Sequence, residues 1–258
     1  MTEIFDLPTP AFLVDLDKLE NNLRGMADLC RENKKQLWPM VKTHKSIEIA
    51  KMQADLGAKG FLVGTIDEAE KLVEHGFKEI MLAYPVASKE NIERVITLAK
   101  KAHIILSFDT KEAASKVDKI CEKEGLYLDY LIIIDSGLHR FGVIPEKAPE
   151  LAKTLREFHH LKFKGIATHP GHVYAKTNSL EVKAVAEEEV NALRLASNLL
   201  EKEGFIVEII ATGSTPTAFY VAKDDKINVL RPGNYVFYDA IQVALGIVPE
   251  ERCALTVI

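Results

Sequence analysis

Short apolar runs alternate with amphipathic stretches along most of the chain. A first run covers residues 11–14, and eight more are rich in Ile, Val, Leu and Phe. Those eight cover residues 37–41, 61–63, 80–83, 103–108, 130–134, 163–168, 207–211 and 227–230. Their apolar character is nearly continuous, as expected of parallel strands that are buried on both faces.

Each of the eight runs except the last precedes a stretch with apolar residues at helical spacing. The longest of these stripes consists of Val182, Ala186, Val190, Leu193, Ala196 and Leu200. Repeated strand–helix units predict an α/β protein, and eight of them predict a (β/α)8 barrel, which takes ~250 residues. An open doubly wound sheet is the alternative, but no Gly-x-Gly-x-x-Gly follows any predicted strand.

The pattern changes after the eighth run. A turn begins at Arg231, and residues 253–258 form a β-rich run at the end of the chain. We therefore expect the barrel to occupy residues 16–240. We expect residues 1–15 and 241–258 to supply strands of a second, mostly β domain that is incomplete in this chain.

Composition excludes several classes of protein. The 258 residues carry a formal charge of −5 without a basic block, so nucleic acid is not an expected partner. No apolar run approaches the ~20 residues that span a bilayer, and the N-terminus lacks signal-peptide features. Cys30, Cys121 and Cys253 are scattered and form no Cys-x-x-Cys pair, which disfavours a disulfide framework and a zinc cluster. We expect a cytoplasmic protein.

Polar residues with catalytic chemistry follow the predicted strands, where the active sites of such barrels lie. They include Lys42, Tyr84, Asp109, Arg140, His169, His172, Tyr174, Thr212–Thr217 and Arg231–Asn234. One lysine, several histidines, two arginines and two Gly-containing turns thus converge on one rim. A lysine past a strand is often only a surface residue. At a barrel mouth, however, a lysine that is desolvated or crowded by cations forms Schiff bases, and His44 and Lys45 lie close enough to crowd Lys42.

The stretch from Thr212 to Thr217 is the clearest binding loop. Gly213 lets the backbone approach a ligand, and Pro216 is expected in the first turn of the following helix. A helix N-terminus is an anion site, and barrels often bind phosphate after strands seven and eight. A simple Ser/Thr helix cap is the alternative, although the neighbouring Gly233-Asn234 turn favours binding.

The other rim residues each have two interpretations. His169 is either a core residue whose hydrogen bonds are satisfied or part of a site. We expect His172 to face the rim. Arg140 either pairs with Asp135 or holds a phenolate or carboxylate. For Tyr84 and Asp109 we favour structural roles.

Four motifs, in their order along the chain, resemble those of fold type III pyridoxal-phosphate enzymes. These enzymes form the alanine racemase N-terminal domain superfamily. These motifs are Lys42-Thr43-His44-Lys45, Asp135-Ser136-Gly137-Leu138-His139-Arg140-Phe141-Gly142, Thr212-Gly213-Ser214-Thr215-Pro216-Thr217 and Arg231-Pro232-Gly233-Asn234-Tyr235. The resemblance covers residues 9–258 and is greatest to the branch of D-threonine aldolase and D-serine dehydratase. It implies pyridoxal 5'-phosphate as the cofactor.

The resemblance assigns roles to individual residues. Lys42 matches the lysine that joins the cofactor, Arg140 the arginine near its phenolic oxygen, and His169 the histidine close to its ring. Arg231 matches the arginine at the pyridine nitrogen, which weakens the ring as an electron sink. The phosphate cradle corresponds to Gly213, Ser214, Thr215, Gly233 and Asn234, and Tyr174 is assigned to the cofactor site as well.

Two departures from the family pattern stand out. Many members have Arg-Pro-His before the lysine, where this chain has Leu37-Trp38-Pro39-Met40. Members of this branch also carry divalent-metal ligands in a C-terminal β domain, so a metal would be bound by a domain that this chain lacks. The resemblance further implies a homodimer with an amino acid as its small-molecule substrate.

The leading functional hypothesis is a lyase that cleaves D-β-hydroxy-α-amino acids, like D-threonine aldolase, into glycine and an aldehyde. In this hypothesis Lys42 exchanges with the substrate amine, and His172 or a metal-bound group takes the β-hydroxyl proton. A D-serine dehydratase or an amino-acid racemase is the alternative, with Lys42 removing the α-proton. A further alternative is a non-catalytic protein that binds pyridoxal phosphate for its homeostasis.

Overall fold

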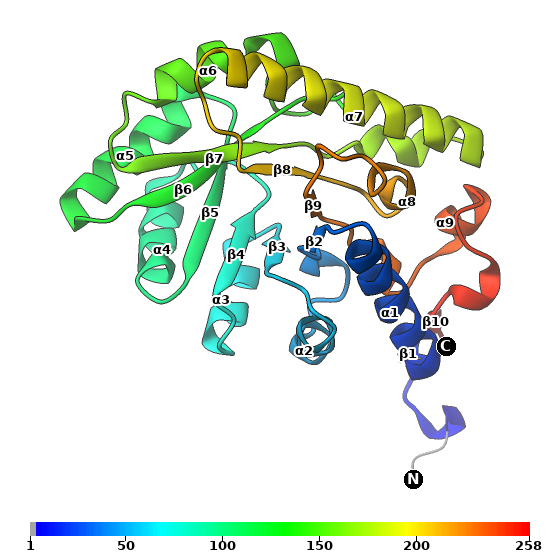
Figure 1. The fold of residues 1–258 in the computed structure, drawn as a ribbon. Coiled ribbons are helices and arrows are strands. Elements are labelled where there is room, and N and C mark those ends of the chain that lie inside the picture. The colour runs from blue at the N-terminus through cyan, green and yellow to red at the C-terminus, as the bar shows by residue number, and fades with distance from the viewer. Residues whose placement is uncertain (1–3) are drawn as a thin grey trace.

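A computed structural model describes residues 4–258 of the chain (Figure 1). Its strands are β1 (Phe12–Val14), β2 (Gln36–Leu37), β3 (Phe61–Val63), β4 (Glu79–Leu82), β5 (His103–Phe108), β6 (Leu128–Ile133), β7 (Leu161–Ala167), β8 (Ile209–Thr212), β9 (Val229–Leu230) and β10 (Leu255–Val257). Its α-helices are α1 (Leu16–Glu32), α2 (Ile47–Asp55), α3 (Ile66–Glu74), α4 (Lys89–Ala99), α5 (Lys111–Glu124), α6 (Ala148–Leu155), α7 (Ser179–Lys202), α8 (Ala218–Val221) and α9 (Ala240–Ala244). Short 3₁₀ turns are η1 (Ile4–Asp6), η2 (Val41–Thr43), η3 (Pro145–Lys147), η4 (Gly171–Ala175), η5 (Asn234–Val236) and η6 (Glu250–Arg252).

Eight parallel strands form one curled sheet in the order β2-β9-β8-β7-β6-β5-β4-β3. A parallel bridge between Met40 and Leu62 joins the two ends of that order. The sheet therefore closes on itself, with helices outside it (Figure 1). The prediction of a (β/α)8 barrel is confirmed, and the open doubly wound alternative is wrong.

Two packed layers hold the barrel together. Its interior is filled by side chains from successive strands, namely Trp38, Met40, Leu62, Met81, Ile105, Leu131, Ala167, Ala211 and Val229. A larger cluster joins the outer faces of the strands to the surrounding helices. Strands buried on both sides need apolar residues at every position, which explains why the runs in the sequence are continuous.

Most helices begin at a side chain that caps a free backbone N–H. Caps of this kind are made by Asp15, Ser46, Thr65, Ser88, Thr110, Asn178 and Asp239. Such a residue typically stabilises a helix by ~1 kcal/mol. Among residues 4–258, no helix is both long and apolar enough to cross a lipid bilayer.

The first predicted strand is shorter than expected. Residues 37–41 were predicted to be extended up to Lys42, but β2 ends at Leu37 and Lys42 lies in the turn η2. Pro39 explains the difference because it has no N–H to donate to a neighbouring strand. Its carbonyl still accepts from the Leu62 N–H at 2.9 Å, so the segment keeps its place at the barrel wall.

A second, two-stranded sheet joins the ends of the described chain. β1 and β10 pair antiparallel, with Phe12 opposite Val257 and Val14 opposite Leu255. Both strands lie to one side of the barrel (Figure 1). The assignment of residues 1–15 and 241–258 to an incomplete β domain stays a prediction, and residues 1–3 of that range lie outside the described residues.

At the amino-terminal end of the strands, His103 bridges two carboxylates. Its Nδ1 lies 2.7 Å from Glu79 Oε2, and its Nε2 lies 2.9 Å from Asp129 Oδ2. The hydrogen bond to Asp129, followed by that to Glu79, raises the pKa of His103 from 6.5 to about 9. The imidazolium therefore ties β4, β5 and β6 together on the side remote from the catalytic rim.

This bridge predicts a pH-dependent stability. Because the folded pKa lies above the ordinary value of 6.5, the contribution is complete below pH 6.5 and is lost as the pH rises through about 9. We expect His103→Gln to lower the free energy of unfolding by no more than ~1 kcal/mol near pH 6, since the site is half exposed. Denaturant titrations near pH 6 and pH 10 check this. An equal difference between variant and wild type at both pH values would contradict it.

Candidate active site

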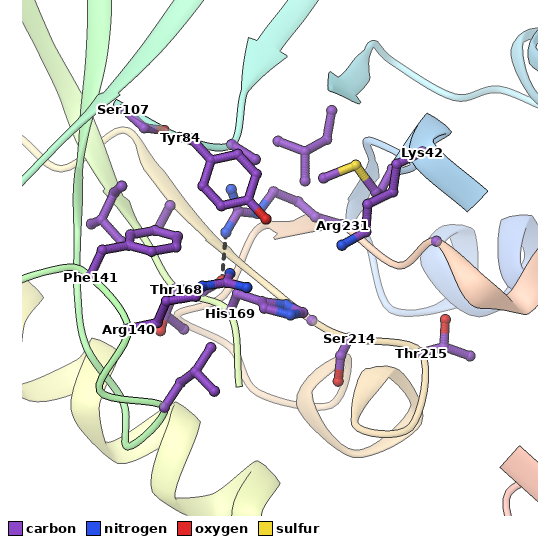
Figure 2. A pocket seen from close by; sticks show the side chains of 18 of the residues that line it. Lys42, Tyr84, Ser107, Arg140, Phe141, Thr168, His169, Ser214, Thr215 and Arg231 are labelled. Carbon is purple, nitrogen blue, oxygen red and sulfur yellow. Dashed lines mark hydrogen bonds between the residues drawn. The ribbon is translucent and has the colours of Figure 1, made fainter. Parts of the chain in front are cut away.

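A cavity of about 260 Å³ opens at the carboxyl ends of the barrel strands. The predicted site residues that line it are Lys42, Arg140, His169, Tyr174, Gly213, Ser214, Thr215, Arg231, Gly233 and Asn234. These residues come from turns after five different strands, and several of their side chains point into the same space (Figure 2). His172 is the one predicted site residue, among those described, that does not line the cavity.

Lys42 reaches the cavity from η2 and is exposed to it. The expected crowding by its neighbours is absent. Burial lowers the pKa of His44 to about 4, so that ring is neutral, and Lys45 Nζ lies 3.4 Å from Glu68 Oε1. The crowding prediction is wrong because one neighbour carries no charge and the other is paired. The cations near Lys42 come from other strands.

Arg231 is one of those cations. It is buried, with Nη2 donating to the Thr168 carbonyl at 2.5 Å (Figure 2) and Nη1 lying 3.6 Å from Met81 Sδ. Burial lowers its pKa to about 10, which leaves the guanidinium charged at neutral pH. Its Nε is buried and has no hydrogen-bond partner within residues 4–258. A buried N–H without an acceptor carries a desolvation penalty that a bound ligand can relieve.

His169 stands among cations and is neutral. Burial, followed by the charges of Arg231, Lys42 and Arg140, lowers the pKa of His169 to about 3. An imidazole with such a pKa is a very weak base at neutral pH. Its ring offers the cavity an uncharged, flat surface.

Arg140 lies beside two aromatic rings at the cavity mouth. Its guanidinium is 5.3 Å from the Tyr84 ring centre and 4.7 Å from that of Phe141. Asp135, the partner that we considered for Arg140, instead accepts from His139 Nδ1 at 2.8 Å. Tyr84 also lines the cavity, and the structural role expected for it stays a prediction.

The loop between Thr212 and Thr217 is held by its own hydroxyl groups. Thr217 Oγ1 accepts from the Ser214 N–H at 3.3 Å, and Thr215 Oγ1 accepts from the Tyr235 N–H at 3.0 Å. Helix α8 begins only at Ala218, so the prediction that Pro216 occupies its first turn is wrong. The fold-back of Thr217 onto Ser214 occupies the positions where a longer helix would have started.

The second turn of the rim, Gly233-Asn234, lies beside this loop, since the Tyr235 N–H donates to Thr215 Oγ1. A Cβ on Gly233 would lie only 3.0 Å from Thr43 Oγ1 and 3.1 Å from Met40 Cβ, so the turn packs directly on the Lys42 segment. Asn234 Nδ2 donates to Asp239 Oδ2 at 2.7 Å. Its Oδ1 is buried without a partner in the described part of the chain.

His172 and Tyr174 lie on η4. The His172 ring sits against Gly137, and its Nε2 is 3.6 Å from Glu188 Oε2, an ion-pair distance longer than a hydrogen bond. Burial raises the pKa of Tyr174 to about 12, so its hydroxyl is protonated and can donate. Tyr174 thus has access to the cavity that His172 lacks.

Glu189 on α7 is a buried residue beside this site that the sequence pattern did not single out. Its carboxyl is fully buried and accepts from the Thr212 hydroxyl and, at 3.0 Å, from the Gly213 N–H. One signal was present in the sequence. Glu189 falls between Ala186 and Leu193 at helical spacing, on the apolar stripe of that helix rather than on its charged side.

The residues present fit pyridoxal 5'-phosphate, the cofactor that the resemblance implies. A primary amine on Lys42, a buried N–H without an acceptor on Arg231 and a turn with positive φ at Gly213 surround one cavity. These match the aldehyde, ring nitrogen and phosphate of the cofactor in chemical type. Within residues 4–258, no group of three His, Cys, Asp or Glu side chains is placed to hold a metal ion.

Several known proteins are similar to this chain over nearly its whole length. A D-threo-3-hydroxyaspartate dehydratase from Delftia sp. (strain HT23) is 30% identical over 257 residues, which are 99% of this chain and 68% of that protein. A 3-hydroxy-D-aspartate aldolase from Paracoccus denitrificans (strain Pd 1222) is 29% identical over 238 residues, 91% of this chain and 62% of that protein. The structure of a D-threonine aldolase from Filomicrobium marinum has a TM-score of 0.93 at 27% identity, covering 98% of this chain and 69% of that one.

The chain spans about two thirds of the length of these relatives. A family profile described as "Alanine racemase, N-terminal domain" matches residues 14–240, which include the whole barrel. That match covers most of the chain. The chain belongs to the alanine racemase N-terminal domain family of barrels, whose cofactor is pyridoxal 5'-phosphate.

Proposed function

We propose that this chain is the cofactor-binding barrel of a lyase that cleaves D-β-hydroxy-α-amino acids, in the manner of a D-threonine aldolase. The observation that carries the proposal is the meeting of Lys42, Arg231 and the Gly213–Thr215 turn at one cavity. The names of relatives support the class of substrate, since they include aldolases and dehydratases of D-hydroxy amino acids.

When bound, pyridoxal phosphate withdraws electrons from the α-carbon of an amino acid joined to it, which weakens the bonds of that carbon. The barrel would hold the cofactor, with the amino acid joined to it, in a fixed orientation. The turns at Gly213–Thr215 and Gly233-Asn234 bind the phosphate, with the Tyr174 hydroxyl as a further donor. The neutral ring of His169 would pack against the cofactor, and Arg140 would face its phenolic oxygen.

Arg231 sets the strength of the electron sink. Its guanidinium stays charged at neutral pH, and its Nε–H has no acceptor within the described residues. A cation that donates to the pyridine nitrogen disfavours a proton on that nitrogen. A cofactor ring that withdraws electrons less strongly favours reactions in which the negative charge on the α-carbon is short-lived.

Lys42 supplies the primary amine that joins the cofactor. With the cofactor and a substrate in place, its ε-amino group would be positioned to move a proton at the α-carbon of the substrate. Of the two candidate bases for the β-hydroxyl, we favour a metal-bound group over His172, because His172 does not line the cavity. His169 is unsuited to that step, because burial and neighbouring cations lower its pKa to about 3.

A dehydratase is the second candidate, and a specific similarity favours it. The Delftia relative and a relative from Dictyostelium discoideum, which is 28% identical over 262 residues, are both named as dehydratases. In that reaction Lys42 removes the α-proton, and the β-hydroxyl then leaves. We further propose a cytoplasmic homodimer, with residues 1–15 and 241–258 belonging to a second domain that carries the metal ligands.

Product analysis decides between these candidates. The protein is supplied with pyridoxal phosphate and, in turn, with D-threonine, D-threo-3-hydroxyaspartate and D-serine, with L-threonine as the control. With the second domain that carries the metal ligands present, we expect glycine and an aldehyde from D-threonine, with loss of turnover when a chelator is added. A keto acid and ammonia would identify a dehydratase. A protein that binds the cofactor but turns over none of these would be a non-catalytic binder.

A further inference from the structure

A buried carboxyl lies beneath the loop that follows β8. Helix α7 passes outside the barrel across β7 and β8 (Figure 1). From this helix the Glu189 side chain reaches Thr212 and Gly213 at the end of β8. That side chain is 0% exposed. Oε1 accepts from the Thr212 hydroxyl and from the Gly213 N–H, so one oxygen holds both the last residue of β8 and the first residue of the loop.

A carboxyl group at this depth needs a physical reason, since burying one without full compensation is costly. Its second oxygen, Oε2, is buried and has no hydrogen-bond partner in residues 4–258. Burial raises the pKa of Glu189 to about 8, although the Thr217 hydroxyl, the Gly213 N–H and the charge of Arg231 oppose that rise. The uncharged acid therefore predominates at neutral pH. An apolar residue would fill this place on α7 without these penalties, as Ala186 and Leu193 do nearby.

Glu189 contributes to the conformation of the loop that follows β8. Gly213 has a φ of +107°, a conformation that only glycine adopts readily. The rest of the loop is tied by Thr217 to Ser214 and by Thr215 to Tyr235, both beyond Gly213. The peptide that joins Thr212 to Gly213 is held from both sides, because its carbonyl accepts from the Arg231 N–H at 2.8 Å and its N–H donates to Glu189 at 3.0 Å. Glu189 supplies the side-chain contact of this pair and so helps to set the direction of the backbone at Ser214 and Thr215.

We propose that Glu189 is a positioning residue for the phosphate-binding loop. From outside the barrel it holds the Gly213 turn in the shape that receives the phosphate of the cofactor. This inference rests on the proposed function, because it takes the loop to bind that phosphate. Glu189 does not line the cavity, so it acts through Gly213 rather than by touching the ligand.

The test compares pyridoxal phosphate with pyridoxal, which has the same ring and aldehyde but no phosphate. Dissociation constants are measured by titrating cofactor-free protein and following near-visible absorbance. Glu189→Met removes the acceptor but keeps most of the volume. Glu189→Gln keeps an acceptor oxygen and mimics the uncharged acid. Glu187→Ala is the matched control, since Glu187 lies on the exposed side of the same helix and pairs with Lys183 at 3.7 Å.

We expect Glu189→Met to weaken pyridoxal phosphate binding roughly ten- to a hundredfold, because the Gly213 N–H and Thr212 hydroxyl lose their acceptor. Pyridoxal binding should be unchanged. Glu189→Gln should stay within about threefold of wild type and Glu187→Ala should match it, since one keeps the acceptor and the other lies outside the loop. A general loss of structure would instead weaken both ligands and lower the melting temperature.

Two results would overturn the proposal. One is an equal loss of both ligands in Glu189→Met, and the other is no loss of either. If Glu189→Met does not fold, Thr212→Val removes one of the two donors, with an expected loss of about three- to tenfold for pyridoxal phosphate alone. If wild-type protein binds neither ligand, the proposed function itself fails, and this inference fails with it.

Discussion

Lys42→Ala is expected to abolish turnover of any D-hydroxy amino acid that the wild-type protein cleaves. The side chain supplies both the amine that joins the cofactor and the group that moves a proton at the α-carbon. Losing positioned proton transfer alone lowers kcat by roughly a hundred- to ten-thousandfold. Because Lys42 is exposed, the free energy of unfolding should change by less than ~0.5 kcal/mol. Steady-state kinetics and denaturant titration measure the two effects separately.

Lys45→Ala is the control for this experiment. Lys45 is three residues away, is exposed and lies 3.4 Å from Glu68 rather than in the cavity lining. We expect its kcat to remain within about threefold of wild type, as for other surface substitutions. Comparable activity in Lys42→Ala and wild type would remove Lys42 from the mechanism.

Gly165→Ala is expected to have the largest effect on folding. Gly165 lies in β7, where it pairs with Leu131 of β6 and Ile209 of β8. A Cβ there would lie 1.9 Å from the Ile209 carbonyl oxygen, and the φ of +152° adds strain. The two strands must separate to admit the methyl group. We expect a loss of more than ~4 kcal/mol, enough to leave the protein insoluble or unfolded.

Gly76→Ala separates this clash from backbone strain. Gly76 also has a positive φ, +92°, but a Cβ there meets no atom within 4 Å. We expect that variant to fold and to lose about 1–2 kcal/mol, the penalty for a left-handed alanine. If Gly165→Ala in denaturant titrations were no less stable than Gly76→Ala, close packing of β7 on β8 would be ruled out.

The barrel was predictable because its determinants are local. Strands buried on both faces require apolar residues at each position, and such runs are visible without knowledge of the fold. The run at residues 103–108 coincides with β5 in full. Element ends were less predictable. Pro39 shortened the first strand, and the Thr217 hydroxyl delayed the start of α8, in both cases through contacts that composition does not reveal.

The positions of the candidate site residues were predictable from the sequence, but their charge states were less so. Residues just after strands were expected at one rim, and the structure brings Lys42, His169 and Arg231 to one cavity. Their electrostatics depend on burial by distant segments. The sequence suggested a cationic His44, whereas burial makes it neutral. Glu189 escaped notice because its partner Gly213 lies 24 residues away.

The most direct test of the account is to find where the cofactor attaches. Wild-type protein is incubated with pyridoxal phosphate, reduced with borohydride and digested, and the labelled peptide is identified by mass spectrometry. We predict a single stable label at Lys42. Label at another lysine, or no label retained after reduction, would contradict the assignment of this cavity as a pyridoxal-phosphate site.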